Sequence, residues 1–184
     1  MSEELEILKD VAEKLDGAGI PYMISGSVAM NYYAEPRMTR DIDVVVTLEK
    51  SGVDRFVSLF EKDYYIDGET VRTEVERKGM FNLINNKYIL KIDFILLKDE
   101  PIHHESFRRR KKVAVNGFDV WMISPEDLVI QKILWARESL SEMQIRDVSN
   151  IVRMNSNMDM NYLAKWLTGL GLKEIFDKAG QQRT

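Results

Sequence analysis

The stretch Asp41-Ile42-Asp43-Val44-Val45-Val46 decides the fold of this chain. Its β-branched residues favour an extended strand, and the apolar run after Asp43 is typical of a strand buried inside a sheet. Side chains alternate along a strand, so we expect Asp41 and Asp43 on the same face. Two unpaired carboxylates on a buried face cost several kcal/mol through repulsion and lost hydration. A bound divalent cation removes that cost, so the stretch predicts a metal site on a sheet.

A third carboxylate, Asp93, interrupts the apolar run of residues 88–97. If this second strand lies beside the first, Asp93 joins Asp41 and Asp43 on one face. Oxygen ligands of this kind favour a hard cation such as Mg²⁺ or Mn²⁺. Such a triad can hold two metal ions bridged by phosphate oxygens, which suits in-line phosphoryl transfer. Asp41, Asp43 and Asp93 are therefore the predicted metal ligands and catalytic residues.

Plainer interpretations of the three carboxylates stay open. In one of them, Asp41 and Asp43 lie on a solvent-facing edge strand, although their β-branched neighbours argue for burial. In the other, Asp93 is a strand-end acid paired with Lys91 or Lys98.

The pair Gly26-Ser27 lies upstream, where a short buried strand at 20–24 is followed by a helix at 28–33. Glycine lets the backbone approach a phosphate closely, and the N-terminus of a helix favours anions. We therefore expect Gly26 and the hydroxyl of Ser27 to hold the β and γ phosphates of a nucleotide. An ordinary tight turn is the alternative.

Around these segments, hydrophobic periodicity and turn residues predict a mixture of helices and strands. Helices are predicted at residues 4–16, 53–60 and 70–78. Strands, paired in two hairpins around Asn85-Asn86-Lys87 and Asn116-Gly117, are predicted at residues 80–84, 88–97, 112–115 and 118–123. This order of elements predicts an α+β (mixed α/β) domain in which helices flank a mixed sheet.

The rest of the chain has the pattern of helices, beginning at Ser124-Pro125-Glu126-Asp127. The serine caps the first helix, the proline takes its first position, and the acids complement the positive end of its dipole. Three further helices follow, and Gly169 and Gly171 interrupt the chain before the last one. The sequence therefore predicts a core with the sheet at residues 1–123 and a helical lobe packed on it at residues 124–184.

The composition excludes several classes of protein. The 184 residues contain no cysteine, which excludes disulfides, thiolate zinc sites and cysteine nucleophiles and fits a cytoplasmic location. The acidic N-terminus is not a secretory signal, and no segment approaches the roughly 18 apolar residues of a membrane helix. The net charge of −4 disfavours a general nucleic-acid coat.

The basic segment Arg108-Arg109-Arg110-Lys111-Lys112 is a local exception to this acidic balance. We interpret it as a solvated face, and a polynucleotide contact is the alternative. The neighbouring His103-His104 pair is expected in a loop near Pro101. It receives no role, because two adjacent histidines rarely complete a metal site.

Taken together, these residues resemble a known superfamily. Gly26-Ser27, thirteen residues, Asp41-Ile42-Asp43 and a later strand aspartate look like the nucleotidyltransferase fold of DNA polymerase β-like proteins. The downstream pattern Ser124-Pro125-Glu126-Asp127-Leu128, Lys132 and Arg146-Asp147-Val148 looks like the helical lobe of AbiEii-type nucleotidyltransferase proteins. The resemblance covers residues 20–153 and implies a nucleotidyltransferase-type mixed sheet followed by a C-terminal helical lobe. The chain departs from that family in the short tail after Asp147.

The resemblance implies roles for two further residues. Lys132 is a candidate triphosphate contact, and Asp147 is a candidate structural or catalytic partner near the nucleotide. The alternatives are a solvated Lys132 and an Asp147 paired with Arg146 or Arg153. Arg40 is a further candidate, which either contacts phosphate or neutralises the neighbouring acids.

The predicted activity is transfer of a nucleoside monophosphate from a nucleoside triphosphate to an acceptor hydroxyl, with Mg²⁺ or Mn²⁺ as cofactor. Asp93 assists deprotonation of the acceptor in this scheme. The AbiEii resemblance implies a toxin-like enzyme that modifies RNA, such as tRNA, or a protein, and that has a cognate antitoxin or toxin. Two alternatives stay open: a catalytically inactive nucleotide-sensing or partner-binding module on the same fold, and a purely structural subunit of a toxin–antitoxin pair.

Overall fold

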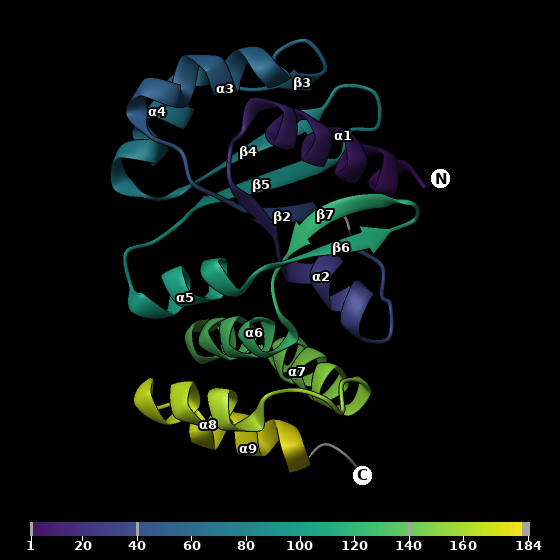
Figure 1. The fold of residues 1–184 in the computed structure, drawn as a ribbon, viewed down its shortest axis with the longest axis vertical. Coiled ribbons are helices and arrows are strands. Elements are labelled where there is room, and N and C mark those ends of the chain that lie inside the picture. The colour runs from purple at the N-terminus through teal and green to yellow at the C-terminus, as the bar shows by residue number, and fades with distance from the viewer. Residues whose placement is uncertain (1, 40, 140, 182–184) are drawn as a thin grey trace.

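A mixed sheet forms the centre of the molecule (Figure 1). The computed structural model describes residues 2–39, 41–139 and 141–181. The strands are β1 (Tyr22–Ile24), β2 (Asp41–Val46), β3 (Tyr64–Tyr65), β4 (Met80–Asn85), β5 (Lys91–Leu96), β6 (Lys111–Val115) and β7 (Phe118–Met122). Their order across the sheet is β3-β4-β5-β2-β1-β7-β6. The β2–β5 and β1–β7 pairs are parallel and the other pairs antiparallel, so the predicted mixed sheet is confirmed.

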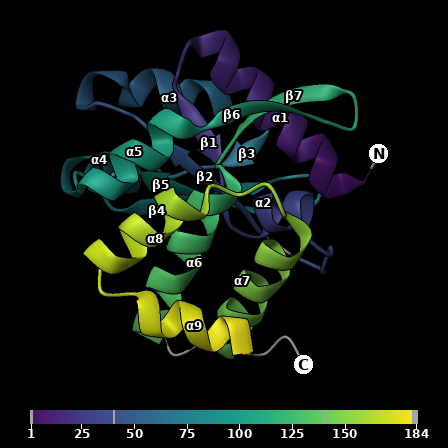
Figure 2. The same ribbon diagram turned by 60° about the horizontal axis from the view of Figure 1, so that its bottom comes forward.

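Helices cover both faces of this sheet. They are α1 (Glu3–Ala18), α2 (Gly26–Tyr33), the 3-10 helix η1 (Lys50–Gly52), α3 (Val53–Phe60), α4 (Gly68–Arg77), α5 (Pro101–Arg109), α6 (Pro125–Ser139), α7 (Glu142–Met154), α8 (Met160–Gly169) and α9 (Lys173–Gln181). Figure 1 shows α1, α3 and α4 on one side of the sheet and α6–α9 on the other, and Figure 2 shows α6–α9 gathered into one lobe. None of the described helices is both long and apolar enough for a membrane span.

The strand β2 lies between β1 and β5, so both of its edges are paired and the edge-strand alternative is wrong. Its parallel pairing with β5 places Asp43 directly opposite Asp93. Ile42 and Val44, on the other face of β2, are fully buried. Residues in register point to the same face of a sheet, and Asp41 is two positions from Asp43. The three carboxylates therefore share one face.

Aromatic packing behind the sheet fixes the direction in which Asp93 points. The ring of Phe94 lies with its centroid 5.1 Å from that of Phe56, 5.7 Å from that of Phe60 and 5.4 Å from that of Phe81. Full burial of such a side chain stabilises a fold by about 1.5–3 kcal/mol. Since neighbouring side chains on a strand point to opposite faces, burial of Phe94 turns Asp93 to the acidic face.

The predicted boundary at residues 123 and 124 falls where the sheet meets the helical lobe. Ser124 caps α6, because its Oγ accepts a hydrogen bond from the Asp127 amide at 3.2 Å. One continuous cluster of buried apolar residues runs from the sheet into the helices beyond this point. The division into a core at residues 1–123 and a separate lobe at 124–184 stays a prediction.

Three of the predicted strand, loop and turn segments compare differently with the structure. The strand β5 begins at Lys91 and not at residue 88, because Ile89 has a φ of 54°, which an extended strand excludes. The predicted loop around His103-His104 is wrong, since these residues belong to α5, which opens with Pro101 in its first turn. The Asn116-Gly117 hairpin is confirmed, with φ of 47° and 88° at the two turn residues.

Candidate active site

Three carboxylates lie on one face of the sheet where β2 pairs with β5. Asp43 is in register with Asp93, and Asp41 precedes it on the same face. The pKa of Asp43 is raised to about 6, first because the carboxyl is buried and then because of the charges on Asp41 and Asp93. The three groups therefore act on one another electrostatically, as the predicted site requires.

Asp41 and Asp93 each have a partner close to their own strand. Thr39 donates a hydrogen bond from Oγ1 to Asp41 Oδ1 at 2.9 Å. Lys91 Nζ lies 2.7 Å from Asp93 Oδ2, so the Lys91 pair considered as an alternative is present. Asp93 Oδ1 is buried and has no hydrogen-bond partner. A buried acceptor left without a partner costs about 1–3 kcal/mol, and a cation at this atom would remove that cost.

The donor set of this face fits a hard divalent cation. It consists of carboxylates alone, one with an unpartnered oxygen and one whose pKa is raised by burial and by its acidic neighbours. Among the described residues, no three acidic or histidine side chains lie close enough to one another to hold a metal ion as they stand. The roles of Asp41, Asp43 and Asp93 as metal ligands stay a prediction.

Gly26 is required by the carboxylate of Asp43. Its φ of +57° lies in the left-handed region, and a Cβ at this position would lie 1.8 Å from Asp43 Oδ2. The backbone amide of Ser27 donates a hydrogen bond that lowers the pKa of Asp43. The Gly26-Ser27 pair thus seats one carboxylate of the triad at the N-terminus of α2, beyond what an ordinary tight turn does. Its contact with phosphate stays a prediction.

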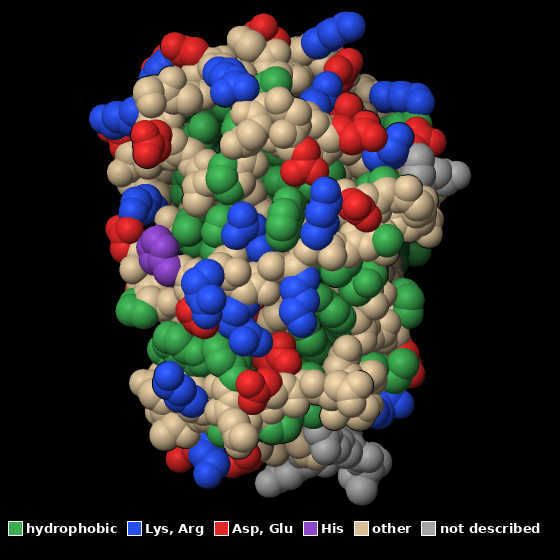
Figure 3. Space-filling view, viewed as in Figure 1, with side chains coloured by type: hydrophobic (Ala, Val, Ile, Leu, Met, Phe, Trp, Pro, Cys, Tyr) green, Lys and Arg blue, Asp and Glu red, His purple; other side chains and the backbone are tan. Residues whose placement is uncertain are grey.

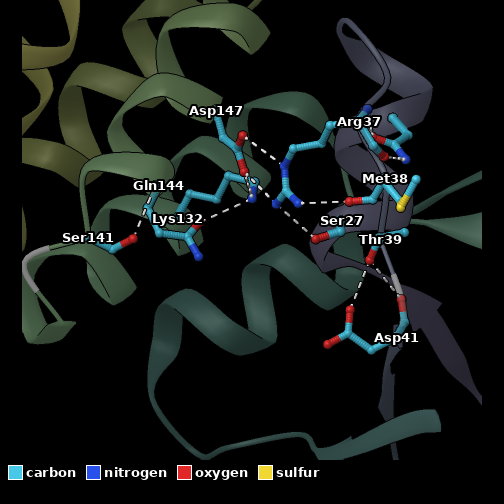
Figure 4. Close-up of polar contacts among 10 residues, drawn as sticks. Ser27, Arg37, Met38, Thr39, Asp41, Lys132, Ser141, Gln144 and Asp147 are labelled. Carbon is cyan, nitrogen blue, oxygen red and sulfur yellow. Dashed lines mark hydrogen bonds and ion pairs between the residues drawn. The ribbon is translucent and has the colours of Figure 1, made fainter.

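Asp147 on α7 joins two cations from separate segments (Figure 4). The guanidinium of Arg37 donates from Nε to Asp147 Oδ1 at 3.3 Å and from Nη2 to Asp147 Oδ2 at 3.1 Å. Lys132 on α6 donates to Asp147 Oδ2 at 2.7 Å and to Gln144 Oε1 at 3.1 Å. One buried anion therefore serves two cations beside the pocket.

Lys132 is a buried cation, so the solvated alternative is wrong. Its side chain is 1% exposed. Burial lowers the pKa of Lys132, and the hydrogen bond to Asp147 offsets only part of this effect. The alternative partners of Asp147 are also wrong, because Arg146 and Arg153 form ion pairs with glutamates elsewhere.

Arg37 is a residue of this site that the sequence analysis missed. Asn31 fixes its backbone, since the Asn31 amide accepts from Arg37 N at 2.9 Å and donates to Arg37 O at 2.8 Å. Arg37 Nη2 also donates to Ser27 Oγ at 3.1 Å. The only sequence signal is its place in the loop that leads to Asp41. Arg40, the arginine that was predicted, lies outside the described residues.

These groups surround an open pocket of about 440 Å³. Asp41 and Asp43 line it from the sheet. Met38 and Met143, 85% and 51% exposed, add apolar surface to it. The other lining residues are Ser27, Arg37, Thr39, Lys132, Trp135 and Gln144. Asp93 does not line the pocket. It lies on the neighbouring strand, directly opposite Asp43, which does.

The basic segment at residues 108–112 contributes no residue to this pocket. Arg109 Nε lies 3.1 Å from Oδ2 of the buried Asp127, and Arg108 Nη2 lies 2.7 Å from Glu105 Oε1. Figure 3 shows basic and acidic side chains interspersed over the face on which α5 and β6 lie. Arg109 therefore anchors α5 to α6, and a polynucleotide contact of the segment stays a prediction without a test.

A family model described as "Nucleotidyl transferase of unknown function (DUF2204)" matches residues 4–168. The chain belongs to this family. The match spans the whole sheet and most of the helical lobe, so it includes every residue of the candidate site. Membership makes this nucleotidyltransferase an enzyme, as the sequence analysis predicted. Among curated proteins, no sequence matches it significantly.

Solved structures of other nucleotidyltransferases have the same fold. An antigenic nucleotidyltransferase-like protein from Paracoccidioides brasiliensis has a TM-score of 0.55 and 18% identity, over 96% of this chain and 93% of that chain. The antibiotic-resistance factor ANT(2″)-Ia has a TM-score of 0.64 and 11% identity, over 98% of each chain. The lincosamide antibiotic adenylyltransferase LnuA, bound to lincomycin, has a TM-score of 0.53 and 11% identity, over 82% of this chain and 96% of that chain.

These likenesses confirm the predicted nucleotidyltransferase fold. At such low identities they show the fold alone. The predicted closeness to AbiEii-type proteins, and the toxin–antitoxin partner that it implies, are not confirmed by these matches and stay predictions.

Proposed function

We propose that this nucleotidyltransferase moves a nucleoside monophosphate from a nucleoside triphosphate to a hydroxyl of RNA, such as tRNA, or of a protein. The proposal includes Mg²⁺ or Mn²⁺ bound by Asp41, Asp43 and Asp93. The observation that carries it is the in-register pairing of Asp43 with Asp93 on the face that Asp41 shares. Acids placed together repel one another, and a divalent cation among them would remove that cost.

The chain's own residues would handle the phosphates and the proton. The acceptor oxygen forms a bond to the α-phosphorus, the bond from that phosphorus to the β-bridging oxygen breaks, and pyrophosphate leaves. The proton of the acceptor hydroxyl would pass to the carboxylate of Asp93, which lies next to the pocket. Gly26 and Ser27 hold phosphate at the N-terminus of α2, and Lys132 adds positive charge to the pocket. When bound, the metal supplies charge that stabilises the phosphate oxygens.

The identity of the acceptor is proposed from the resemblance to AbiEii-type proteins, which also suggests a cognate antitoxin or toxin. The same fold serves LnuA, an adenylyltransferase of lincosamide antibiotics, so small molecules with hydroxyl groups belong in the test. A catalytically inactive nucleotide-sensing module with this fold is the alternative function. It would bind the nucleotide in the same pocket without transferring it.

Incubation with each of the four α-labelled ribonucleoside triphosphates and Mg²⁺ tests the proposal. Label should appear on cellular RNA, on protein or on a small-molecule fraction, and Asp41→Asn should abolish it. Asp119→Asn is a matched control, because this acid is exposed and pairs only loosely with Lys112 at 3.9 Å. Label that persists in Asp41→Asn would remove the metal mechanism, whereas binding without transfer would favour the sensing module.

A further inference from the structure

Two cations line the described part of the pocket, Arg37 and Lys132, and they differ in access to it. The Lys132 side chain is 1% exposed, and its ammonium donates to Asp147 and to Gln144. The Arg37 side chain is 29% exposed. A ligand that enters the pocket can therefore reach the guanidinium of Arg37 without displacing buried protein groups, whereas two of the three donors of the buried Lys132 ammonium are directed at protein acceptors.

The geometry also aims Arg37 at the start of α2. Its backbone is held by two hydrogen bonds to Asn31, and its Nη2 donates to Ser27 Oγ at 3.1 Å. Figure 4 shows the guanidinium between Asp147 and Ser27. Its Nη1 has only a long contact of 3.5 Å to the carbonyl of Met38. This nitrogen is the one most available to a new acceptor.

The charges of the cluster leave a net cation on this wall. Arg37 and Lys132 carry two positive charges, and Asp147 supplies one negative charge to both. A guanidinium that is already oriented suits the binding of phosphate, because its charge and its remaining donor are held in place before the ligand arrives. Asp147 accepts from Nε and Nη2, and Ser27 accepts from Nη2 as well, so Nη1 is the nitrogen that remains for a phosphate oxygen.

We propose that Arg37 is the residue that contacts the β and γ phosphates, and that Lys132 is a positioning residue that acts through Asp147. This inference rests on the proposed function, since it needs a triphosphate in the pocket. Lys132 holds Asp147, Asp147 holds Arg37, and Arg37 meets the phosphates beside Ser27. The charge of Arg37 then also stabilises the pyrophosphate that leaves.

Calorimetric titration with ATP, GTP, CTP and UTP, each in the presence of Mg²⁺, tests this assignment. The triphosphate that binds the wild type best is compared with its nucleoside, which has the same base and no phosphate. Arg37→Met should weaken the triphosphate by about 10- to 100-fold, the range expected for one lost charged hydrogen bond. Binding of the nucleoside should stay unchanged.

Two further variants serve as a matched control and as a conservative replacement of Arg37. Arg146→Met is the matched control, because this arginine is exposed and pairs only with Glu142 on the same helix. It should bind the triphosphate as the wild type does. Arg37→Lys keeps a cation but loses the fork, so it should recover part of the affinity, and it decides the question if Arg37→Met fails to fold.

The outcomes distinguish this inference from the proposed function. Triphosphate binding by Arg37→Met that equals wild-type binding overturns the role of Arg37 and leaves the proposed function intact, and so does binding by Arg37→Lys that is no better than that of Arg37→Met. An equal loss of triphosphate and nucleoside affinity also overturns it, because that result indicates a structural role. If the wild type binds none of the four triphosphates, the proposed function fails, and this inference fails with it.

Discussion

The carboxylate of Asp43 occupies the space in which a side chain at position 26 would begin. A Cβ on Gly26 would lie 1.8 Å from Asp43 Oδ2, and the φ of +57° at this residue is itself unfavourable for other amino acids. The strand β2 and the first turn of α2 are thus fitted to each other at the point where one carboxylate of the candidate site is seated.

This contact leads to a prediction for Gly26→Ala. The methyl group must displace Asp43 or the start of α2, so we expect a loss of about 1–3 kcal/mol in the free energy of unfolding and loss of transfer activity. Gly17→Ala is the control, because nothing lies within 4 Å of its Cβ position inside α1. Urea unfolding should show that the control variant is unchanged or slightly more stable. A fully active Gly26→Ala protein would contradict the close fit.

The raised pKa of Asp43 predicts how stability depends on pH without metal. Because the folded-state pKa of about 6 exceeds the ordinary 3.8, the folded protein binds this proton more tightly than the unfolded chain does. The stabilisation is complete below pH 3.8 and is lost as the pH rises through 6. The difference corresponds to about 3 kcal/mol. Asp43→Asn should lack this loss, so in EDTA it should gain stability relative to the wild type between about pH 4 and pH 6, and the difference should stay constant at higher pH. Parallel pH profiles of the two proteins in urea unfolding would contradict the prediction.

Divalent cations should reverse the same loss. Mg²⁺ or Mn²⁺ removes the repulsion among Asp41, Asp43 and Asp93, and an ion at about 100 times its Kd stabilises the folded state by about 2.7 kcal/mol. We therefore expect the melting temperature at pH 8 to rise with added ion and to fall again with EDTA. Asp43→Asn should respond much less. An equal response from both proteins would place the bound ion elsewhere.

The shared anion Asp147 predicts an asymmetry between two core substitutions. Lys132→Met leaves Asp147 paired with Arg37, whereas Asp147→Leu leaves two cations without their partner. Removal of one member of a buried pair costs about 3–5 kcal/mol. We expect the loss in the free energy of unfolding to be at or below the lower end of this range for Lys132→Met. For Asp147→Leu we expect it at the upper end. Chemical denaturation of both variants and of the double variant measures the coupling. A larger loss in Lys132→Met would contradict the sharing.

Much of the acidic face followed from local rules of sequence. The strand at Asp41–Val46 has the predicted bounds, and strand alternation placed Asp41 and Asp43 together. The position of Asp93 needed one further assumption, namely that the two apolar strands are neighbours. The register between Asp43 and Asp93 bears it out. Apolar strands interrupted by acids are uncommon enough to mark a site by themselves.

The cationic side of the pocket, formed by Arg37 and Lys132, could not be predicted in the same way. Arg37 is an arginine in an irregular loop, and such residues are usually solvated. Its role depends on Asp147, which lies 110 residues away in the sequence, and on a fold that brings α7 to this loop. The helix α5 was missed for a different reason, since it is short and its sequence around His103-His104 contains few apolar residues.

The ionic cluster around Asp147 also limits how the enzyme can move. It joins the loop after α2 to two helices of the C-terminal lobe, so a hinge motion that separates lobe from sheet must pull Arg37 from Asp147, while Lys132 and Asp147 stay together. Such a motion is expensive in a buried setting. Met38, in the loop after α2, and Met143, on α7, both line the pocket, so the Arg37–Asp147 pair ties together the two segments that carry them.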